Sequence, residues 1–206
     1  MKTQMTRKGR LLLSVFIATV SMAAIPIVHA QAPSDFTSEP DKTMASAQVS
    51  FVKGDMDKAA AHIQKAAAYV HKEGAKVTKD AKQGVMTAGD QLTKLGKEVK
   101  KGTVKSGDQL KKTFAQVDHQ LAKAWHMTAD QTQKSGKNAT DALKKAGAGL
   151  EGAAKWSGTQ LGEGAQASVD GLKKAGQGVK LGAEDVGTFF KGLGVGIADM
   201  GQKLGS

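Results

Sequence analysis

Apolar residues recur every seven positions between residues 165 and 204, and this repeat limits the fold more than any other feature of the chain. A second apolar set follows members of the first at a distance of four positions. On an α-helix, residues at these spacings form one stripe, which has to be covered by another surface. The segment therefore predicts a helix packed on a partner. The residues that we expect to make this contact are Leu172, Val179, Val186, Phe190, Leu193, Ile197, Met200 and Leu204.

The same kind of pattern continues upstream, with no proline to interrupt it. Prolines stand at 26, 33 and 40, so the chain from residue 41 onwards can form long helices. Leu150, Leu161 and Leu172 lie eleven positions apart, which mixes hendecad with heptad spacing. We predict an all-α fold, an elongated antiparallel bundle of long amphipathic helices, in which the C-terminal stripe packs on the helices between residues 56 and 125.

The predicted organisation is a single helical domain over residues 43–206, preceded by two shorter segments. Residues 1–30 have the composition of a signal peptide, and the polar, proline-bearing residues 31–42 predict a flexible leader. Glycines and polar runs place the helices at about 43–53, 55–100, 104–130 and 139–204, with candidate breaks near residues 74 and 162.

The N-terminus has the three parts of a secretory signal peptide. Basic residues precede an apolar run over 11–24, and Val28, His29 and Ala30 supply a cleavage site. The apolar run is shorter than the roughly 20 residues that span a membrane, which disfavours a retained anchor. We therefore expect cleavage after Ala30 and a periplasmic or secreted mature chain.

Every basic residue after Ala30 is a lysine, because Arg7 and Arg10 are the only arginines. Loss of the signal peptide, with four basic residues and no acidic one, lowers the formal net charge from +11 to +7. Specific nucleic-acid recognition depends on the planar arginine fork, so we expect no specific nucleic-acid partner. Lysine surfaces are solvated or attracted to anionic surfaces. The chain has no cysteine, which excludes disulfides and thiol catalysis.

Glycine is concentrated in the last third of the chain, where 16 of the 25 glycines follow Ala146. Each interior glycine costs a helix roughly 1 kcal/mol relative to alanine. We therefore expect this part to be packed, bound to a partner or partly disordered, since it is not stable as an isolated helix. Pairs four positions apart, such as Gly192 and Gly196, allow another backbone to approach closely, within the protein's own bundle or at a membrane partner.

Motifs that resemble known chemical sites lack the context that such sites need. Gly147, Gly149 and Gly152 fit the G-x-G-x-x-G dinucleotide pattern, but a helix rather than a strand is expected before them. His119 and His126 share a helix face but are separated by about 10 Å, too far to hold one metal ion. We therefore predict no enzymatic activity, no cofactor and no metal site.

Two segments resemble known families. Residues 78–92, TKDAKQGVMTAGDQL, resemble group 3 late-embryogenesis-abundant proteins and, more loosely, apolipoprotein helices; the resemblance extends over about half the chain. The larger apolar residues of this chain, with Trp and Phe, depart from that family's very polar helices and favour a folded bundle. A single stretch within residues 44–70 resembles the turn and second helix of a tetratricopeptide repeat, which implies a helical hairpin.

These observations favour a non-enzymatic structural or interaction protein of the cell envelope, for which the late-embryogenesis-abundant resemblance implies a stress-protective role. The alternative is a peripheral lipid-binding protein that acts through its lysine-rich faces and the glycine-rich C-terminal helix. The expected partner is a protein or an anionic membrane surface, and self-association into a homo-oligomer is a further option.

Overall fold

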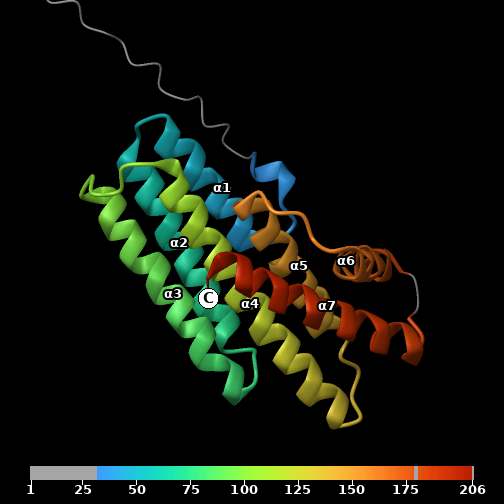
Figure 1. Cartoon of the computed structure of the whole chain (residues 1–206). Coiled ribbons are helices and arrows are strands. Elements are labelled where there is room, and N and C mark those ends of the chain that lie inside the picture. Colours follow the sequence, from blue (N-terminus) through green and yellow to red (C-terminus); the bar gives the residue numbers. More distant parts are fainter. Residues whose placement is uncertain (1–31, 179–180, 206) are drawn as a thin grey trace, which may run out of the picture.

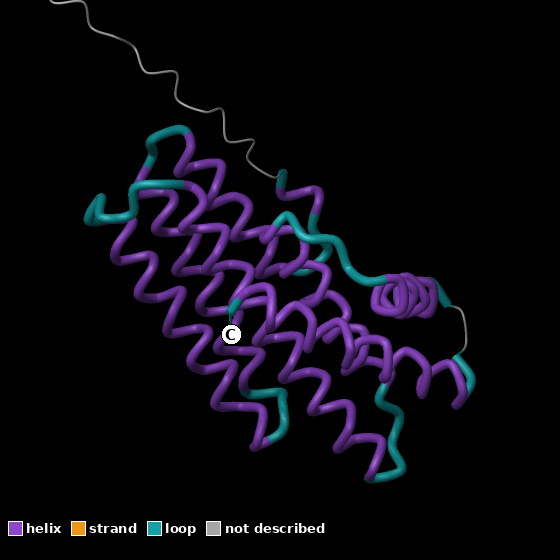
Figure 2. The backbone as a smooth tube through the Cα atoms, viewed as in Figure 1, coloured by secondary structure: helices purple, strands orange, loops and turns teal. Residues whose placement is uncertain are grey.

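The protein is a bundle of helices (Figure 1), described by a computed structural model for residues 32–178 and 181–205. The predicted all-α fold is confirmed: the described residues contain seven α-helices, joined by short loops in Figure 2, and no strand. The predicted signal peptide lies outside the described residues. In chain order the elements are the 3₁₀ turn η1 (Pro33–Asp35), α1 (Glu39–Val52), α2 (Met56–Gly74), α3 (Lys79–Lys100), α4 (Gly107–Lys134), α5 (Thr140–Ser157), α6 (Glu163–Gly176) and α7 (Ala183–Leu204).

Local sequence signals set many of the helix ends. The side chains of Ser38, Asp55 and Ser106 accept hydrogen bonds from backbone N–H groups in the first turns of α1, α2 and α4. These bonds satisfy donors that the start of a helix leaves without a partner. The candidate break near residue 74 is present, because α2 ends at Gly74 and α3 begins at Lys79.

The segment predicted over 139–204, with a candidate break near residue 162, contains three helices, one more than that single break allows. The break between α5 and α6 falls at the candidate position near residue 162, whereas the one between α6 and α7 was not predicted. Gly178, in that second connection, has a φ of +100°, a conformation that favours glycine. The seven-residue repeat runs from Leu172 to Val186 across this connection, so the periodicity gives no sign of a break.

The leader predicted over 31–42 is also wrong where the structure describes it, because this segment packs on the bundle. Phe36 is buried, and its ring stacks on Trp156 of α5 with 4.6 Å between the ring centroids. Pro40 does not prevent a helix from starting at Glu39, since the first turn tolerates proline. Burial of this aromatic ring supplies the free energy that orders a polar, proline-bearing segment.

Helix α4 joins two hydrophobic clusters into one domain. Phe114 and Leu121 of α4 pack in a cluster with α1, α2 and α3, while Trp125 and Ala129 of the same helix pack in a second cluster with α5, α6 and α7. In Figure 1 the first five helices lie side by side, and α6 is seen end-on because it crosses the others. The buried faces of α4 therefore position both halves of the protein.

Helix α7 is covered by the protein itself. Leu193 and Met200 are fully buried, and Gly196 lies so close to α6 that a Cβ there would come within 2.5 Å of the Ala165 Cβ. Helix α7 packs on α4, α5 and α6. The predicted packing surface was the helices between residues 56 and 125, and of the three observed partners only α4 belongs to that region. Helices α6 and α7 cross closely at glycines such as Gly196. The apolar repeat alone does not predict a contact at these positions.

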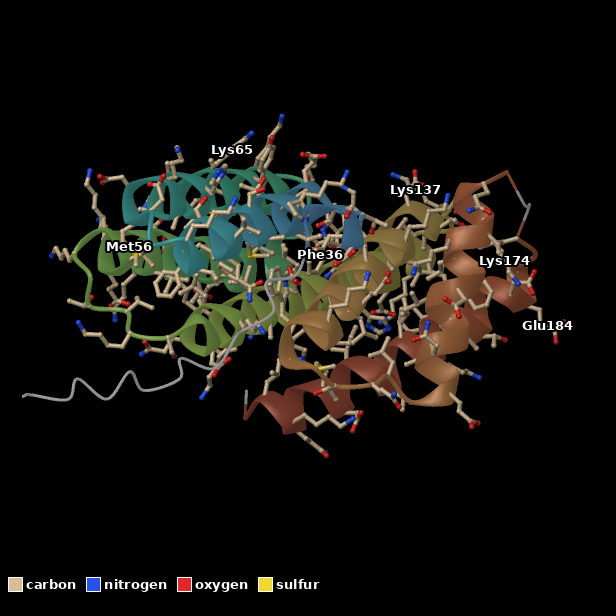
Figure 3. All side chains as sticks on the ribbon, turned by 90° about the horizontal axis from the view of Figure 1, so that it is seen from above. Phe36, Met56, Lys65, Lys137, Lys174 and Glu184 are labelled. Carbon is tan, nitrogen blue, oxygen red and sulfur yellow. The ribbon has the colours of Figure 1, made fainter. Side chains whose placement is uncertain are left out.

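Charged side chains cover the outside of the bundle. Figure 3 shows Lys65, Lys137 and Lys174 pointing away from the helices, while Phe36 points into them. Across residues 32–178 and 181–205, no helix combines the length and the apolar character that crossing a membrane requires.

Candidate functional site

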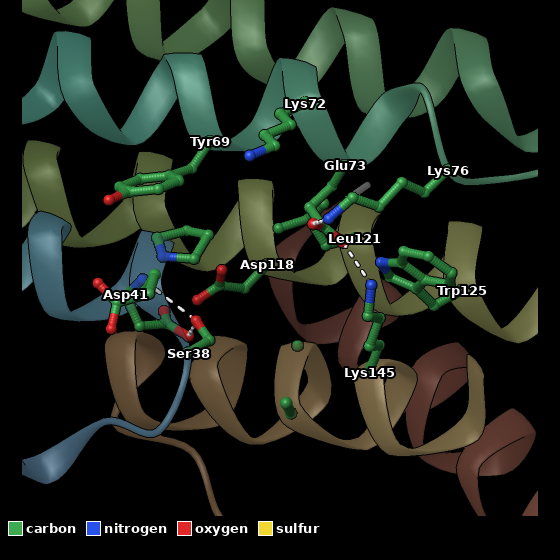
Figure 4. A pocket seen from close by; sticks show the side chains of 14 residues that line it. Ser38, Asp41, Tyr69, Lys72, Glu73, Lys76, Asp118, Leu121, Trp125 and Lys145 are labelled. Carbon is green, nitrogen blue, oxygen red and sulfur yellow. Dashed lines mark hydrogen bonds and ion pairs between the residues drawn. The ribbon is translucent and has the colours of Figure 1, made fainter. Parts of the chain in front are cut away.

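A cavity of about 350 Å³ opens between the N-terminus of α1 and the helices α2, α4 and α5. Four segments that are distant in the sequence meet here, as Figure 4 shows, so that only the folded chain forms the cavity. Its walls combine apolar and aromatic side chains with acids and lysines: Ser38, Glu39, Pro40, Asp41, Tyr69, Lys72, Glu73, Lys76, Asp118, Leu121, Trp125, Lys145, Ala148 and Gly149.

The inner end of the cavity holds two buried carboxyl groups, from Asp41 of α1 and Asp118 of α4, which are 2% and 1% exposed. Ser38 Oγ donates to Asp41 Oδ2 at 2.5 Å, and Trp156 Nε1 donates to Asp41 Oδ1 at 3.1 Å. Asp118 is less well supported: among the described residues, no donor meets either of its carboxyl oxygens with full hydrogen-bond geometry, although the Trp156 indole and the Asp41 carboxyl group lie close enough to shift its pKa. In Figure 4 its side chain points from α4 towards Ser38 and Asp41.

Burial raises the pKa of the Asp118 carboxyl well above its usual range, and the negative charge of Asp41 raises it further. The indole of Trp156 lowers this pKa, but the opposing effects are larger. Asp118 therefore holds a proton at pH values at which an exposed aspartate is ionised. A buried acid kept neutral in this way, at the wall of a cavity, is a common feature of functional sites.

The mouth of the cavity carries a network of two lysines and one glutamate. Glu73 of α2 accepts from Lys76 Nζ at 2.5 Å and from Lys145 Nζ of α5 at 2.9 Å. Burial opposes ionisation of Glu73, but these two lysines outweigh it and hold the pKa of the Glu73 carboxyl below its usual value. Lys145 also lies over the ring of Trp125, 4.0 Å from the centroid, which fixes one side of the cavity.

Glycines of α5 make room for Asp118. A Cβ on Gly149 would stand 2.9 Å from both Ala122 N and Asp118 O, so α5 touches the backbone of α4. A Cβ on Gly152 would stand 2.5 Å from Asp118 Oδ2 and 3.0 Å from Asp41 Oδ1. These two glycines of the G-x-G-x-x-G pattern thus lie inside a helix and serve helix packing.

The histidines that share a face of α4 bind the backbone of α7 instead of lining the cavity. His119 Nε2 lies 2.9 Å from Ile197 O, and His126 Nε2 lies 3.0 Å from Phe190 O. The His126 ring also stacks on Phe190, with the ring centroids 4.1 Å apart. Burial lowers the pKa of His119, and the hydrogen bond to Ile197 only partly offsets this effect. In the part of the chain that the structure describes, no group of three acidic, histidine or cysteine side chains is arranged to hold a metal ion.

The contact residues predicted in the C-terminal stripe lie away from this cavity. Leu172, Leu193, Ile197 and Met200 are buried in the second hydrophobic cluster. Val186, Phe190 and Leu204 are partly buried and pack against this cluster, while Val179 lies outside the described residues. The structure thus brings the described members of the stripe together as packing residues.

The sequence contains one signal for the cavity that periodicity alone passes over. Asp118 stands four positions after Phe114 and three before Leu121, in the middle of the buried face of α4. An ionisable residue at such a buried position has to be paired with an opposite charge, stay in its neutral form or serve a function. Its neighbours Asp41 and Trp156 are far away in the sequence, so the pattern on α4 does not predict which groups surround it.

Comparisons of the chain with protein-family models, with curated proteins and with solved structures find no match. The cavity itself combines three kinds of group that bind small molecules. The rings of Tyr69 and Trp125 offer apolar surface, the carboxyl pair accepts hydrogen bonds, and the lysines at the mouth supply positive charge. This mixture of mainly apolar walls and a few convergent polar groups is typical of ligand sites.

Proposed function

We propose that the protein is a non-enzymatic binding protein of the cell envelope, periplasmic or secreted, that holds a small ligand in the cavity between α1, α2, α4 and α5. The observation that carries the proposal is Asp118, a buried carboxyl group at the cavity wall without a hydrogen-bond donor of its own. A buried polar group without a partner destabilises the folded protein by about 1–3 kcal/mol, which is tolerated where the group serves a ligand. The signal-like N-terminus supports the proposed compartment.

The size and lining of the cavity also support a small ligand. Ligand sites commonly enclose about 300–1,000 Å³, and this cavity of about 350 Å³ lies at the lower end of that range. Its apolar walls come mainly from side chains of the helices α2, α4 and α5 and not from loops, and sites built on helices are commonly preformed. A preformed site avoids part of the entropic cost of binding.

The test is binding of a neutral fluorescent probe, N-phenyl-1-naphthylamine, to the purified mature chain and to two matched variants. Ala148→Trp fills the cavity from α5, whereas Ala61→Trp adds the same ring to the exposed face of α2. We expect saturable binding of one probe per chain, lost in Ala148→Trp and retained in Ala61→Trp. Circular dichroism melts establish that both variants fold. Absence of saturable binding to the unmodified chain, or unchanged binding to a folded Ala148→Trp variant, contradicts the proposal.

The alternative of a lipid-binding protein has less support, because the described helices present no broad exposed apolar face. Among the described residues, Val52 and Val195 are the large apolar side chains that stand exposed, at 50% and 70%. Membrane-surface helices need a broad apolar face in addition to lysines. The lysines alone predict weak adsorption to anionic vesicles that disappears at about 0.5 M salt. Flotation with vesicles that persists at high salt would favour the lipid alternative instead.

A further inference from the structure

The two carboxyl groups at the inner end of the cavity indicate which kind of ligand it takes. Building on the proposed function, we propose that the ligand is an organic ammonium ion with an apolar body, and that its charged group binds the carboxyl group of Asp118 beside Asp41. The inference rests on the geometry of the carboxyl pair, on the charges around it and on the shape of the walls.

The geometry leaves acceptor capacity at Asp118. Asp118 Oδ2 and Asp41 Oδ1 both lie close to Gly152 of α5, 2.5 Å and 3.0 Å from the position that a Cβ there would take, so the glycine leaves room for the two carboxyl groups side by side. Asp41 already accepts from Ser38 and Trp156, whereas the oxygens of Asp118 are buried without a donor in the described structure. An ammonium group carries only donors, and it satisfies a carboxylate pair that a second acceptor would repel.

The carboxyl pair at the inner end lacks a lysine partner among the described residues. Lys76 and Lys145 bind Glu73, and Glu39 pairs with Lys42, so these charges are engaged elsewhere. Lys72, the remaining lysine of the lining, is exposed, and no ion pair in the described structure joins it to Asp41 or Asp118. An ionised Asp118 therefore places a second negative charge beside Asp41, which either a proton or a monovalent cation relieves.

Exchange of the Asp118 proton for an ammonium ion conserves charge and atoms. An ammonium ion enters, the O–H bond of the Asp118 carboxyl group breaks, and the proton leaves to solvent, while the nitrogen keeps its own hydrogens. No other bond changes. Since the ligand competes with a proton, binding becomes tighter as the pH rises and releases up to about one proton per ligand.

The walls select an organic cation over an inorganic one. Tyr69, Leu121 and Trp125 line the cavity and present apolar surface to it. A bare metal cation gains nothing from such walls and needs about six oxygen ligands, whereas the described residues offer no group of three suitable side chains. An apolar body fills this space and gains the free energy of leaving water.

The experiment compares three probes of the same size that differ in charge: phenethylamine, 2-phenylethanol and phenylacetate. Titration calorimetry of the mature chain gives their affinities, and repetition in two buffers of different ionisation enthalpy gives the protons released. We expect phenethylamine to bind at least about tenfold more tightly than the alcohol, and the alcohol more tightly than phenylacetate. We also expect proton release with the amine alone and a rise in amine affinity with pH.

Asp118→Asn tests the residue itself, and Asp130→Asn is the matched control at the other end of α4. We expect Asp118→Asn to lose the preference for the amine and the proton release while it still binds the alcohol. Asp130→Asn keeps both. Equal affinities of the unmodified chain for amine and alcohol overturn the ammonium inference but leave the cavity as a binding site. Binding of neither compound, together with no binding of N-phenyl-1-naphthylamine, overturns the proposed function as well.

Discussion

Replacement of Asp118 by asparagine is expected to stabilise the unliganded protein, although Asp118 is one of its most buried residues. The substitution keeps the shape of the side chain and cannot ionise. Its amide nitrogen can donate to Asp41, as the protonated carboxyl group can and the ionised carboxylate cannot. The variant therefore stays neutral beside Asp41 without taking up a proton on folding, whereas most changes to buried residues lower stability.

The size of this effect follows from the raised pKa of the Asp118 carboxyl in the folded protein. In the unfolded chain aspartate has a pKa of about 3.9, so between that value and the raised folded-state pKa the folded protein holds more protons. The free energy of unfolding therefore falls as the pH rises through this window, by at most about 1.4 kcal/mol per pH unit. Up to about pH 7 the loss reaches at most about 4 kcal/mol, and asparagine avoids it.

The assay is urea unfolding of the two proteins at several pH values between about 4 and 7. We expect Asp118→Asn to be more stable by about 1–3 kcal/mol near neutral pH, with a difference that shrinks towards pH 4. Asp130→Asn on the same helix loses an exposed pair with Lys134 and should change stability by less than about 1 kcal/mol at any of these pH values. A destabilised Asp118→Asn variant, or a difference independent of pH, would refute the reasoning.

Three further predictions concern helix packing, pH and processing. Gly149→Ala should destabilise the protein by about 1–3 kcal/mol, because the new Cβ meets the backbone of α4, whereas Gly187→Ala in open space should stabilise it by about 0.5–1 kcal/mol; urea unfolding separates them. Burial lowers the pKa of His119, so the folded protein binds fewer protons than the unfolded chain once the pH falls below about 6.5, the pKa of an unfolded histidine. The free energy of unfolding should therefore decrease as the pH falls below this value. Urea unfolding of His119→Gln over the same range should not show this decrease. Mass spectrometry of the native protein should find Gln31 as the first residue, and a chain that retains Met1 would contradict the signal peptide.

The helices and their buried faces are largely a local property of this sequence. Apolar steps of three and four between Met56 and Val99, together with caps such as Ser106, are enough to predict helices there. The confirmed all-α fold follows from such patterns because each helix satisfies its own backbone and needs only one covered face. Of the three states expected for the glycine-rich last third, the described residues show packing, since Leu193, Gly196 and Met200 of α7 are buried.

Other features depended on contacts that no local pattern encodes. The segment around Phe36 is ordered because Trp156, 120 positions later, offers a ring to stack on. The break at Gly178 is invisible in a repeat that continues through it. His119 and His126 were separated along one helix, and the structure pairs each with a carbonyl of α7.

The cavity depends both on a local sequence pattern and on tertiary contacts. The sequence by itself placed a charged residue, Asp118, on the apolar face of α4, and hence determined that something unusual must surround it. The tertiary structure decided what that is: a second carboxyl group from Asp41, an indole from Trp156 and an open space instead of a lysine. The physical reason is that burial and charge are sums over neighbours in space, and the neighbours of Asp118 come from α1, α2 and α5.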